Sequence, residues 1–204
     1  MNKEIIKSIS YNQDEIIRDI IRLHCKTNIE LDPCYSKGVF YKSGIVKKPI
    51  YKFDIDPISG VEKGDCRSLP LADNSISTMI FDPPFLATTG KSLRIENENN
   101  KINKRFGVYK NESDLYQMYF DSLDEFGKIL KPNGILIFKC QDKVSSGKQY
   151  WMHIDIVNYA TKIGYKLIDM FILLSKSRIV AQWQVNNQKN ARKYHSYFLV
   201  FKKI

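Results

Sequence analysis

Apolar side chains recur along the chain with two different spacings, which predict two kinds of secondary-structure element. Helical spacing of the apolar positions predicts amphipathic helices at residues 10–26, 112–130 and 151–164. Short, nearly continuous apolar runs predict strands at residues 29–31, 49–55, 76–81, 135–140, 166–175 and 196–203. Because strands that alternate with helices are typical of a parallel sheet covered on both faces, we expect an α/β fold with a doubly wound, mostly parallel sheet.

The last two predicted strands have only a basic, amide-rich loop between them, so they should form an antiparallel hairpin at the C-terminal edge of the sheet. Residues 86–111 are polar, rich in Asn and Lys, and without apolar periodicity, which predicts a long loop. No internal repeat and no linker interrupts the 204 residues. This length fits one domain, 1–204, without a separate target-recognition domain.

Aspartates mark the ends of several predicted strands. Asp32, Asp54, Asp65 and Asp82 each fall at a strand end or in the loop that follows it. In parallel α/β sheets, ligands lie beyond the carboxyl ends of the strands. We therefore expect these four acids to share one edge of the sheet and to include functional residues. A capping or turn role is the alternative for each of them.

The apolar run 76–81 ends in the sequence Asp82-Pro83-Pro84-Phe85. Such a sequence can simply terminate a strand, because proline lacks a donor and fixes its own φ. A chemical interpretation accounts for all four residues together. The Asp82 carboxylate and the Pro83 carbonyl are two acceptors that suit the two N–H bonds of an exocyclic amino group. Phe85 then offers a flat face on which a base extruded from its helix can stack.

The charge balance favours a polyanionic partner. The net charge is +10, from 32 basic and 22 acidic residues, and no acidic residue follows Asp169. Two polar segments, 86–111 and 176–193, combine basic side chains with amides and one tryptophan. Their candidate nucleic-acid contacts are Lys91, Arg94, Arg105, Arg178, Trp183, Lys189 and Arg192. A solvated charged face is the alternative interpretation.

The remaining composition predicts a cytoplasmic protein with free thiols. The four cysteines form no CxxC pair, and the polar N-terminus does not resemble a secretory signal. No apolar run approaches the roughly 20 residues that span a bilayer, so we expect no membrane association. The three histidines are far apart and lack zinc-like spacing with the cysteines, so we expect no metal site.

The DPPF sequence resembles the (D/N)PP(Y/F) motif of the S-adenosylmethionine-dependent methyltransferases that act on the N6 amino group of adenine, most closely those acting on DNA. Two further segments are similar to this family: ILKPNGILIFKC (129–140) to its fifth strand, and residues 64–85 to its third and fourth strands. The similarity extends from about Asn12 to the final strand. It implies a Rossmann-like methyltransferase sheet, S-adenosyl-L-methionine as cofactor, and direct displacement on a flipped base. The catalytic residues that the resemblance implies are Asp82, Pro83, Pro84 and Phe85.

The resemblance also implies a set of cofactor contacts. Asp32 occupies the place of the acid in the family's first motif, which here reads LDPCYSKGVFY and retains only Gly38 as glycine. Asp54, or Asp56 close to it, stands where an acid meets the ribose hydroxyls, and Asp65 where an acid meets the adenine amino group. The short distance between Asp54 and Asp65 predicts a crossover without the usual helix. The implied cofactor-binding residues are Asn12, Asp32, Cys34, Gly38, Asp54 and Asp65.

Several alternatives share this motif. The same acceptors suit adenine in RNA, or cytosine N4, although cytosine enzymes more often carry Ser at the position of Asp82. A protein glutamine methyltransferase usually carries Asn there and fits the basic charge poorly. The altered first motif is also compatible with a catalytically idle, nucleic-acid-binding subunit. A specificity partner or a second copy of the chain is a further expected partner.

Overall fold

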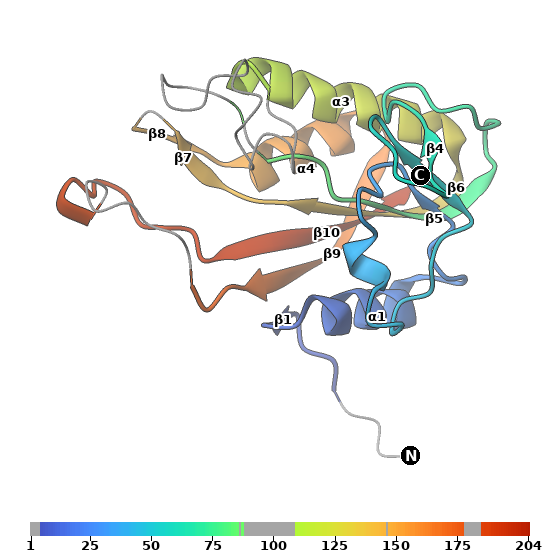
Figure 1. Ribbon diagram of the computed structural model, residues 1–204, viewed down its shortest axis with the longest axis horizontal. Helices are drawn as coiled ribbons and strands as arrows, with labels where there is room; N and C mark the ends of the chain where they lie inside the picture. The colour runs from blue at the N-terminus through green and yellow to red at the C-terminus, as the bar shows by residue number, and fades with distance from the viewer. Residues whose placement is uncertain (1–4, 86, 88–108, 146, 178–184) are drawn as a thin grey trace.

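The computed structural model describes residues 5–85, 87, 109–145, 147–177 and 185–204 (Figure 1). Its centre is an eight-stranded sheet with the strand order β1-β9-β10-β6-β5-β2-β3-β4. The strands of this sheet are β1 (Ile9–Ser10), β2 (Leu31–Asp32), β3 (Tyr51–Asp54), β4 (Glu62–Lys63), β5 (Ile76–Phe81), β6 (Leu130–Cys140), β9 (Tyr165–Leu174) and β10 (His195–Lys203). A separate two-stranded sheet pairs β7 (Lys143–Ser145) with β8 (Lys148–Tyr150).

The sheet is mostly parallel, which confirms the predicted fold class. Only β10 is antiparallel to its neighbours, β6 and β9. The predicted C-terminal hairpin is therefore β9–β10, and β1 adds two paired residues outside it. Since β9 runs in the same direction as β6, the segment that joins β9 to β10 leaves the sheet at the edge where β6 ends. This is the edge at which the parallel strands present their carboxyl ends.

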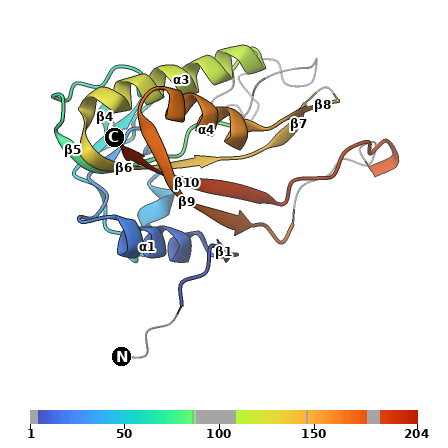
Figure 2. The same ribbon diagram turned by 180° about the vertical axis from the view of Figure 1, so that it is seen from behind.

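Helices cover both faces of the sheet (Figures 1 and 2). On one face lie α3 (Glu112–Ile129) and α4 (Met152–Lys162), and on the other lie α1 (Gln13–His24) and the short 3-10 helix η1 (Val39–Tyr41). Successive side chains of β5 alternate between the two layers. Met79 and Phe81 belong to the core under α3 and α4, whereas Ile80 belongs to the core over α1. All three are fully buried, which explains why the sequence shows a continuous apolar run here.

The crossovers near β3 are short, as the sequence predicts. Residues 55–61 join β3 to β4 without a helix, and η1 is the helical element between β2 and β3. After α3, residues 131–134 bulge out of β6 between its pairings with Ile76 and Thr78. Asn133 takes a positive φ of 64° in this bulge, a conformation that asparagine tolerates better than most residues.

No helix within the described residues is long and apolar enough to cross a membrane. The same part of the chain contains no group of three or more His, Cys, Asp or Glu side chains arranged to hold a metal ion.

Candidate active site at the carboxyl edge of the sheet

Two hydrogen bonds from side chains of other elements hold the turn after β5, and both are accepted by backbone carbonyls of the turn. The Tyr119 hydroxyl, from α3, donates to the carbonyl of Pro84 at 2.7 Å, and the Lys143 ammonium donates to the carbonyl of Phe85 at 2.8 Å. No donor among the described residues reaches the carbonyl of Pro83. Because Pro84 holds the preceding residue extended, Pro83 cannot begin a helix whose later N–H groups would reach this carbonyl. An acceptor is thus left open beside Asp82.

Asp82 is held by a lysine that comes from β6. The Lys139 ammonium donates to Asp82 Oδ2 at 3.1 Å and to Gln13 Oε1 at 2.9 Å. The lysine side chain is 12% exposed. Burial raises the pKa of Asp82, and the positive charge of Lys139 counteracts part of that rise. The ammonium also lies within 5.1–5.9 Å of three ring centroids, those of Phe40, Phe198 and Phe85.

A pocket of about 340 Å³ opens beside Phe85 and Lys139. Its volume lies within the range of small-molecule sites and is sufficient for a single base. Phe85 is only partly buried, so part of its ring is accessible from the pocket. The other lining residues come from the N-terminal segment, β9, β10 and the end of β6: Tyr11, Gln13, Gln141, Leu173, Leu174, Ser175, His195 and Ser196.

Lys139 was missed by sequence reasoning because it lies in a run that reads as a buried strand, ILIFKC. The lysine within this apolar run could have indicated a buried interaction, since a buried lysine requires a polar or charged partner. Asn12, the residue of the N-terminal segment that was predicted to contact the cofactor, caps α1: its Oδ1 accepts from the backbone N–H of Asp14 at 2.9 Å. Its cofactor contact stays a prediction. Gln13 is the residue of this segment that reaches the partner of Asp82.

Asp32 lies at the end of β2, and 2% of its surface is exposed. Its Oδ2 accepts from the Tyr41 hydroxyl at 2.8 Å, and its Oδ1 accepts from the backbone N–H of Cys34 at 3.1 Å. Burial, with smaller contributions from the charges of Asp82 and Asp54, raises the pKa of Asp32 to about 7. These contacts make Asp32 an organiser of the loop after β2, and its predicted contact with a cofactor stays a prediction.

Asp54 ties the same loop to the end of β3. Its Oδ2 accepts from the backbone N–H of Ser36 at 2.8 Å, and its Oδ1 accepts from that of Asp56 at 3.0 Å. Ser36 takes a positive φ of 49°, so the loop turns sharply at this contact. Of the two candidate ribose acids, Asp54 is therefore the one bonded to the loop. Asp56 is exposed.

The loop after β4 brings Asp65 and Cys66 to this region. Asp65 forms a two-pronged ion pair with Arg67, with an Nη2–Oδ2 distance of 2.6 Å, and this partner lowers the pKa of Asp65. The Cys66 thiol interacts with that of Cys34 and accepts from the Ser122 hydroxyl at 3.3 Å. Two of the predicted cofactor residues, Asp65 and Cys34, thus reach the same part of the edge from different loops.

Gly38 has a positive φ of 60°, and a Cβ atom there would lie 2.6 Å from the hydroxyl of Tyr35. A side chain at this position is therefore excluded both by backbone conformation and by space. Gly38 lines a second, larger pocket rather than the one beside Phe85.

Two of the residues predicted to contact nucleic acid lie in the part of the chain that the structure describes. Lys189 and Arg192 lie between β9 and β10, in the segment that leaves the sheet at the edge where β5 and β6 end. Lys189 is exposed and Arg192 is partly exposed. The neighbouring Lys193 places its ammonium 5.0 Å from the Trp151 ring centroid. The other predicted contacts, Lys91, Arg94, Arg105, Arg178 and Trp183, lie outside the described residues.

No family model matches the chain, and no curated protein matches its sequence. Solved structures do resemble it. A protein from Galdieria sulphuraria, proposed to be a sarcosine dimethylglycine methyltransferase, has a TM-score of 0.55 and 12% identity, over 93% of this chain and 84% of that chain. TrmN from Thermus thermophilus has a TM-score of 0.52 and 14% identity, over 96% of this chain and 50% of that chain.

A third protein, also from Thermus thermophilus and proposed to be a DNA modification methylase, was crystallised with S-adenosyl-L-methionine. It has a TM-score of 0.47 and 18% identity, over 69% of this chain and 53% of that chain. The present chain thus spans about half the length of this protein and of TrmN. Identities this low establish the fold alone: the chain has the Rossmann-like methyltransferase fold. Its function has to be argued from its site.

Proposed function

We propose that the protein transfers a methyl group from S-adenosyl-L-methionine to the exocyclic N6 of adenine in DNA. The observation that carries this proposal is the unpaired carbonyl of Pro83 next to the Asp82 carboxylate, whose Oδ1 has no hydrogen bond among the described residues. An amino group has two N–H donors, and these two oxygens are acceptors presented by consecutive residues. The neighbouring carbonyls of Pro84 and Phe85 already accept hydrogen bonds, so the turn keeps its shape when a base enters.

Accepting both N–H bonds withdraws the amino nitrogen from conjugation with its ring and directs its lone pair outward. As the nitrogen becomes positive, the Asp82 carboxylate and the Pro83 carbonyl dipole stabilise the developing charge. Phe85 supplies a face for the extruded base, a contact worth ~1–3 kcal/mol per base in comparable sites. Pro83 and Pro84 keep the turn extended. The protein supplies no nucleophile of its own.

The acids at this edge fit S-adenosyl-L-methionine, whose sulfonium group is positively charged and supplies an electrophilic methyl group. Asp54 and Asp82 both lie close enough to Asp32 for their charges to raise its pKa. Asp54 would accept from the ribose hydroxyls, since a carboxylate has about four lone-pair sites and only two are occupied by backbone donors. Gly38 and Cys34 belong to the same loop, and Asp65 and Asn12 complete the proposed cofactor contacts.

Lys139 acts as a positioning residue in this proposal. By holding Asp82 Oδ2, it orients the carboxylate so that Oδ1 is left for the amino group. Its contact with Gln13 links this orientation to the start of α1. Its ammonium lies 5.9 Å from the Phe85 ring centroid, so the base-stacking residue and the acceptor share one anchor.

DNA would be bound by basic residues that lie beside this edge. Lys189 and Arg192 project from the β9–β10 connection, and Lys91, Arg94, Arg105, Arg178 and Trp183 are proposed to join them. Residues 1–204 would act as one cytoplasmic catalytic domain. A partner subunit or a second copy is proposed to contribute sequence specificity.

Adenine in RNA and cytosine N4 remain the alternatives, because both present an amino group to the same two acceptors. The idle-subunit alternative is favoured by one specific observation. Every carboxylate oxygen of Asp32 and Asp54 already accepts a bond from the protein itself. A loop closed in this way stays folded without a cofactor.

Methyl transfer from radiolabelled S-adenosyl-L-methionine to unmethylated DNA and to RNA tests the proposal, with digestion of the products to nucleosides. We expect label in N6-methyl-2′-deoxyadenosine and its loss in Asp82→Ala. Label only in N6-methyladenosine would select RNA adenine as the substrate, and label only in N4-methyl-2′-deoxycytidine would select cytosine in DNA. Absence of label on any nucleoside, together with absence of cofactor binding, would leave the idle nucleic-acid-binding subunit.

A further inference from the structure

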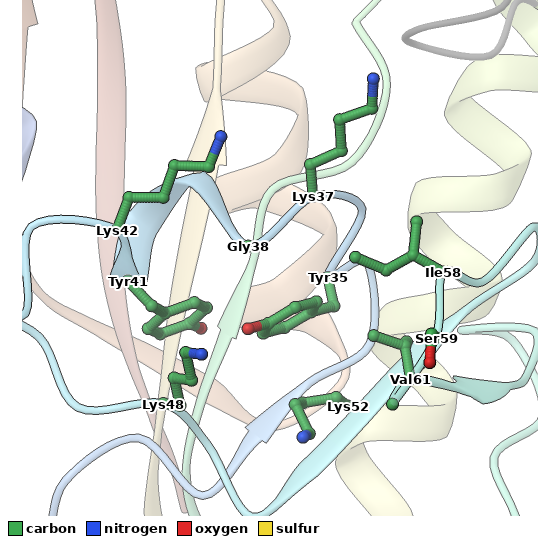
Figure 3. Close-up of a pocket in the computed structure, with 11 residues that line it drawn as sticks. Tyr35, Lys37, Gly38, Tyr41, Lys42, Lys48, Lys52, Ile58, Ser59 and Val61 are labelled. Atoms are coloured by element: carbon green, nitrogen blue, oxygen red, sulfur yellow. The ribbon is translucent and has the colours of Figure 1, made fainter.

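A second pocket, of about 480 Å³, lies between the loop after β2 and the β3–β4 connection (Figure 3). It is separate from the pocket beside Phe85, with which it shares no lining residue. Its walls combine lysines, two tyrosines and a short apolar rim: Tyr35, Lys37, Gly38, Tyr41, Lys42, Lys48, Lys52, Ile58, Ser59, Gly60 and Val61.

All charged residues that line this pocket are lysines. In the described part of the chain, none of Lys37, Lys42, Lys48 and Lys52 forms an ion pair. Four ammonium groups around one concavity repel one another, and a concave wall of low polarity strengthens their combined field. An anion that enters the pocket relieves this repulsion. The charge therefore points to a ligand that carries more than one negative charge.

The tyrosines give the pocket a rigid aromatic wall. The rings of Tyr35 and Tyr41 are stacked, with centroids 5.3 Å apart and an interplanar angle of 7°. Both residues are buried, and the Tyr41 hydroxyl is fixed by its hydrogen bond to Asp32. Figure 3 shows Lys48 extending toward the ring of Tyr41. The Lys52 ammonium lies 5.9 Å from the Tyr35 ring centroid. These two lysines are thus the ones placed beside the flat, preformed surface of the rings.

The proposed methyl donor does not suit this pocket. S-adenosyl-L-methionine carries a sulfonium and an ammonium group against a single carboxylate, so its net charge is positive and four lysines would repel it. Phosphate groups are negatively charged and would be attracted by the lysines, since lysine is a common phosphate partner. The volume lies within the range of sites for small molecules and is adequate for one nucleotide.

We propose that this pocket binds the phosphate groups of a nucleotide, with Lys48 and Lys52 as its principal contacts and the tyrosine wall beside the ligand. The same phosphate chemistry is presented by a free nucleoside polyphosphate and by the backbone of a nucleic-acid strand. The site goes beyond the proposed methyl transfer and does not depend on it, because it does not use the acceptors at Asp82. Of the proposed cofactor contacts, the pocket contains only Gly38. The Tyr41–Asp32 hydrogen bond connects its wall to the loop after β2.

Isothermal titration calorimetry at about 0.1 M salt tests the site with four probes: tripolyphosphate, thymidine triphosphate, thymidine and an oligothymidylate. None of them contains adenine or donates a methyl group, so their binding requires no methyl transfer. Because the oligothymidylate can also bind the basic residues between β9 and β10, only the part of its binding that is lost in K48Q/K52Q is assigned to the pocket. We expect saturable binding of the phosphate-bearing probes and none of thymidine. The variant K48Q/K52Q should weaken that binding about tenfold or more, the loss expected for two charged contacts. The matched control K47Q/K63Q removes the same charge from exposed positions outside the pocket and should bind like the wild type.

The relative affinities identify the source of the phosphates. Tighter binding of thymidine triphosphate than of the oligothymidylate, lost in K48Q/K52Q, supports a free nucleotide as the ligand. Tighter binding of the oligothymidylate with the same lysine dependence supports a strand backbone. Equal affinities of K48Q/K52Q and the wild type, an equal loss in K47Q/K63Q, or no saturable binding of any phosphate-bearing probe would overturn the proposal. Circular dichroism of both variants verifies that they are folded.

Discussion

The turn after β5 and the loop after β2 end parallel strands at the same edge of the sheet, but they leave different groups for a ligand. In the turn, the carbonyl of Pro83 has no donor among the described residues, while the carbonyls on its C-terminal side are taken. In the loop, both carboxylate oxygens of Asp32 and both of Asp54 accept bonds from the protein. The turn is therefore organised for a donor that comes from outside, and the loop is organised first for its own conformation.

Aspartates at corresponding strand ends therefore have different roles. Asp82 is anchored by Lys139, a residue that also lines the pocket beside Phe85, and its Oδ1 accepts no hydrogen bond among the described residues. Asp32 is buried and bonded to its own loop. Substitutions at these positions should therefore affect different properties: catalysis in one region, and folding or cofactor binding in the other.

Asp82→Ala should give the largest effect, a fall in the methyl-transfer rate of about 100-fold or more, as for removal of one electrostatic contact to a transition state. Cofactor affinity should change little, because the variant removes an acceptor for the substrate amino group. Single-turnover rates and cofactor titration measure the two quantities separately. An unchanged rate would remove Asp82 from the chemistry.

Asp32→Asn should change the pH dependence of folding. Because the pKa of Asp32 is raised to about 7 in the folded protein, the folded state holds a proton that the unfolded state has lost between about pH 4 and pH 7. The Asp32 contribution to the free energy of unfolding is thus fully present below pH 4 and declines as the pH rises to about 7. The asparagine variant lacks this decline, by an amount on the order of a few kcal/mol.

Urea unfolding of both proteins between pH 4 and pH 8 measures this effect. Relative to the wild type, Asp32→Asn should gain stability as the pH rises. A difference that is independent of pH would contradict the proposed protonation of the buried carboxyl group.

Asp54→Ala should weaken the binding of S-adenosyl-L-methionine by about 10- to 100-fold, the range for charged hydrogen bonds to a ligand. Asp56→Ala is the matched control, since Asp56 is exposed and its side chain is not bonded to the loop. Equilibrium dialysis with labelled cofactor compares the two. If Asp56→Ala has the larger effect, the assignment of the ribose contact to Asp54 is wrong.

Lys139→Gln should lower the methyl-transfer rate by about tenfold, because Asp82 loses the charged donor that orients it. Gln13→Ala removes only the second, neutral contact of the ammonium and should have a smaller effect, of about threefold. Parallel rate measurements at saturating cofactor test this order. A larger effect of Gln13→Ala would contradict the anchoring role of Lys139.

Much of the fold followed from the sequence because its signals are local. The continuous apolar run of β5 reflects burial on both faces, and the helical period of 112–130 produced α3 at Glu112–Ile129. The Asp-Pro-Pro-Phe sequence located the turn because proline acts on its immediate neighbours. Lys139 and Tyr119 could not be assigned in this way, since their partners Asp82 and Pro84 lie far away in the sequence. Only the strand order and the packing of α3 bring them together.

The identity of the methylated atom decides whether the Asp82 carboxylate and the Pro83 carbonyl bind an amino group. After incubation with deuterated S-adenosyl-L-methionine and genomic DNA, mass spectrometry of the digested nucleosides locates the transferred group. The account predicts a deuterated methyl group on an exocyclic amino nitrogen, N6 of adenine, because the Asp82 carboxylate and the Pro83 carbonyl accept two N–H bonds. A methyl group on a ring carbon or ring nitrogen, which presents no such pair of donors, would contradict it.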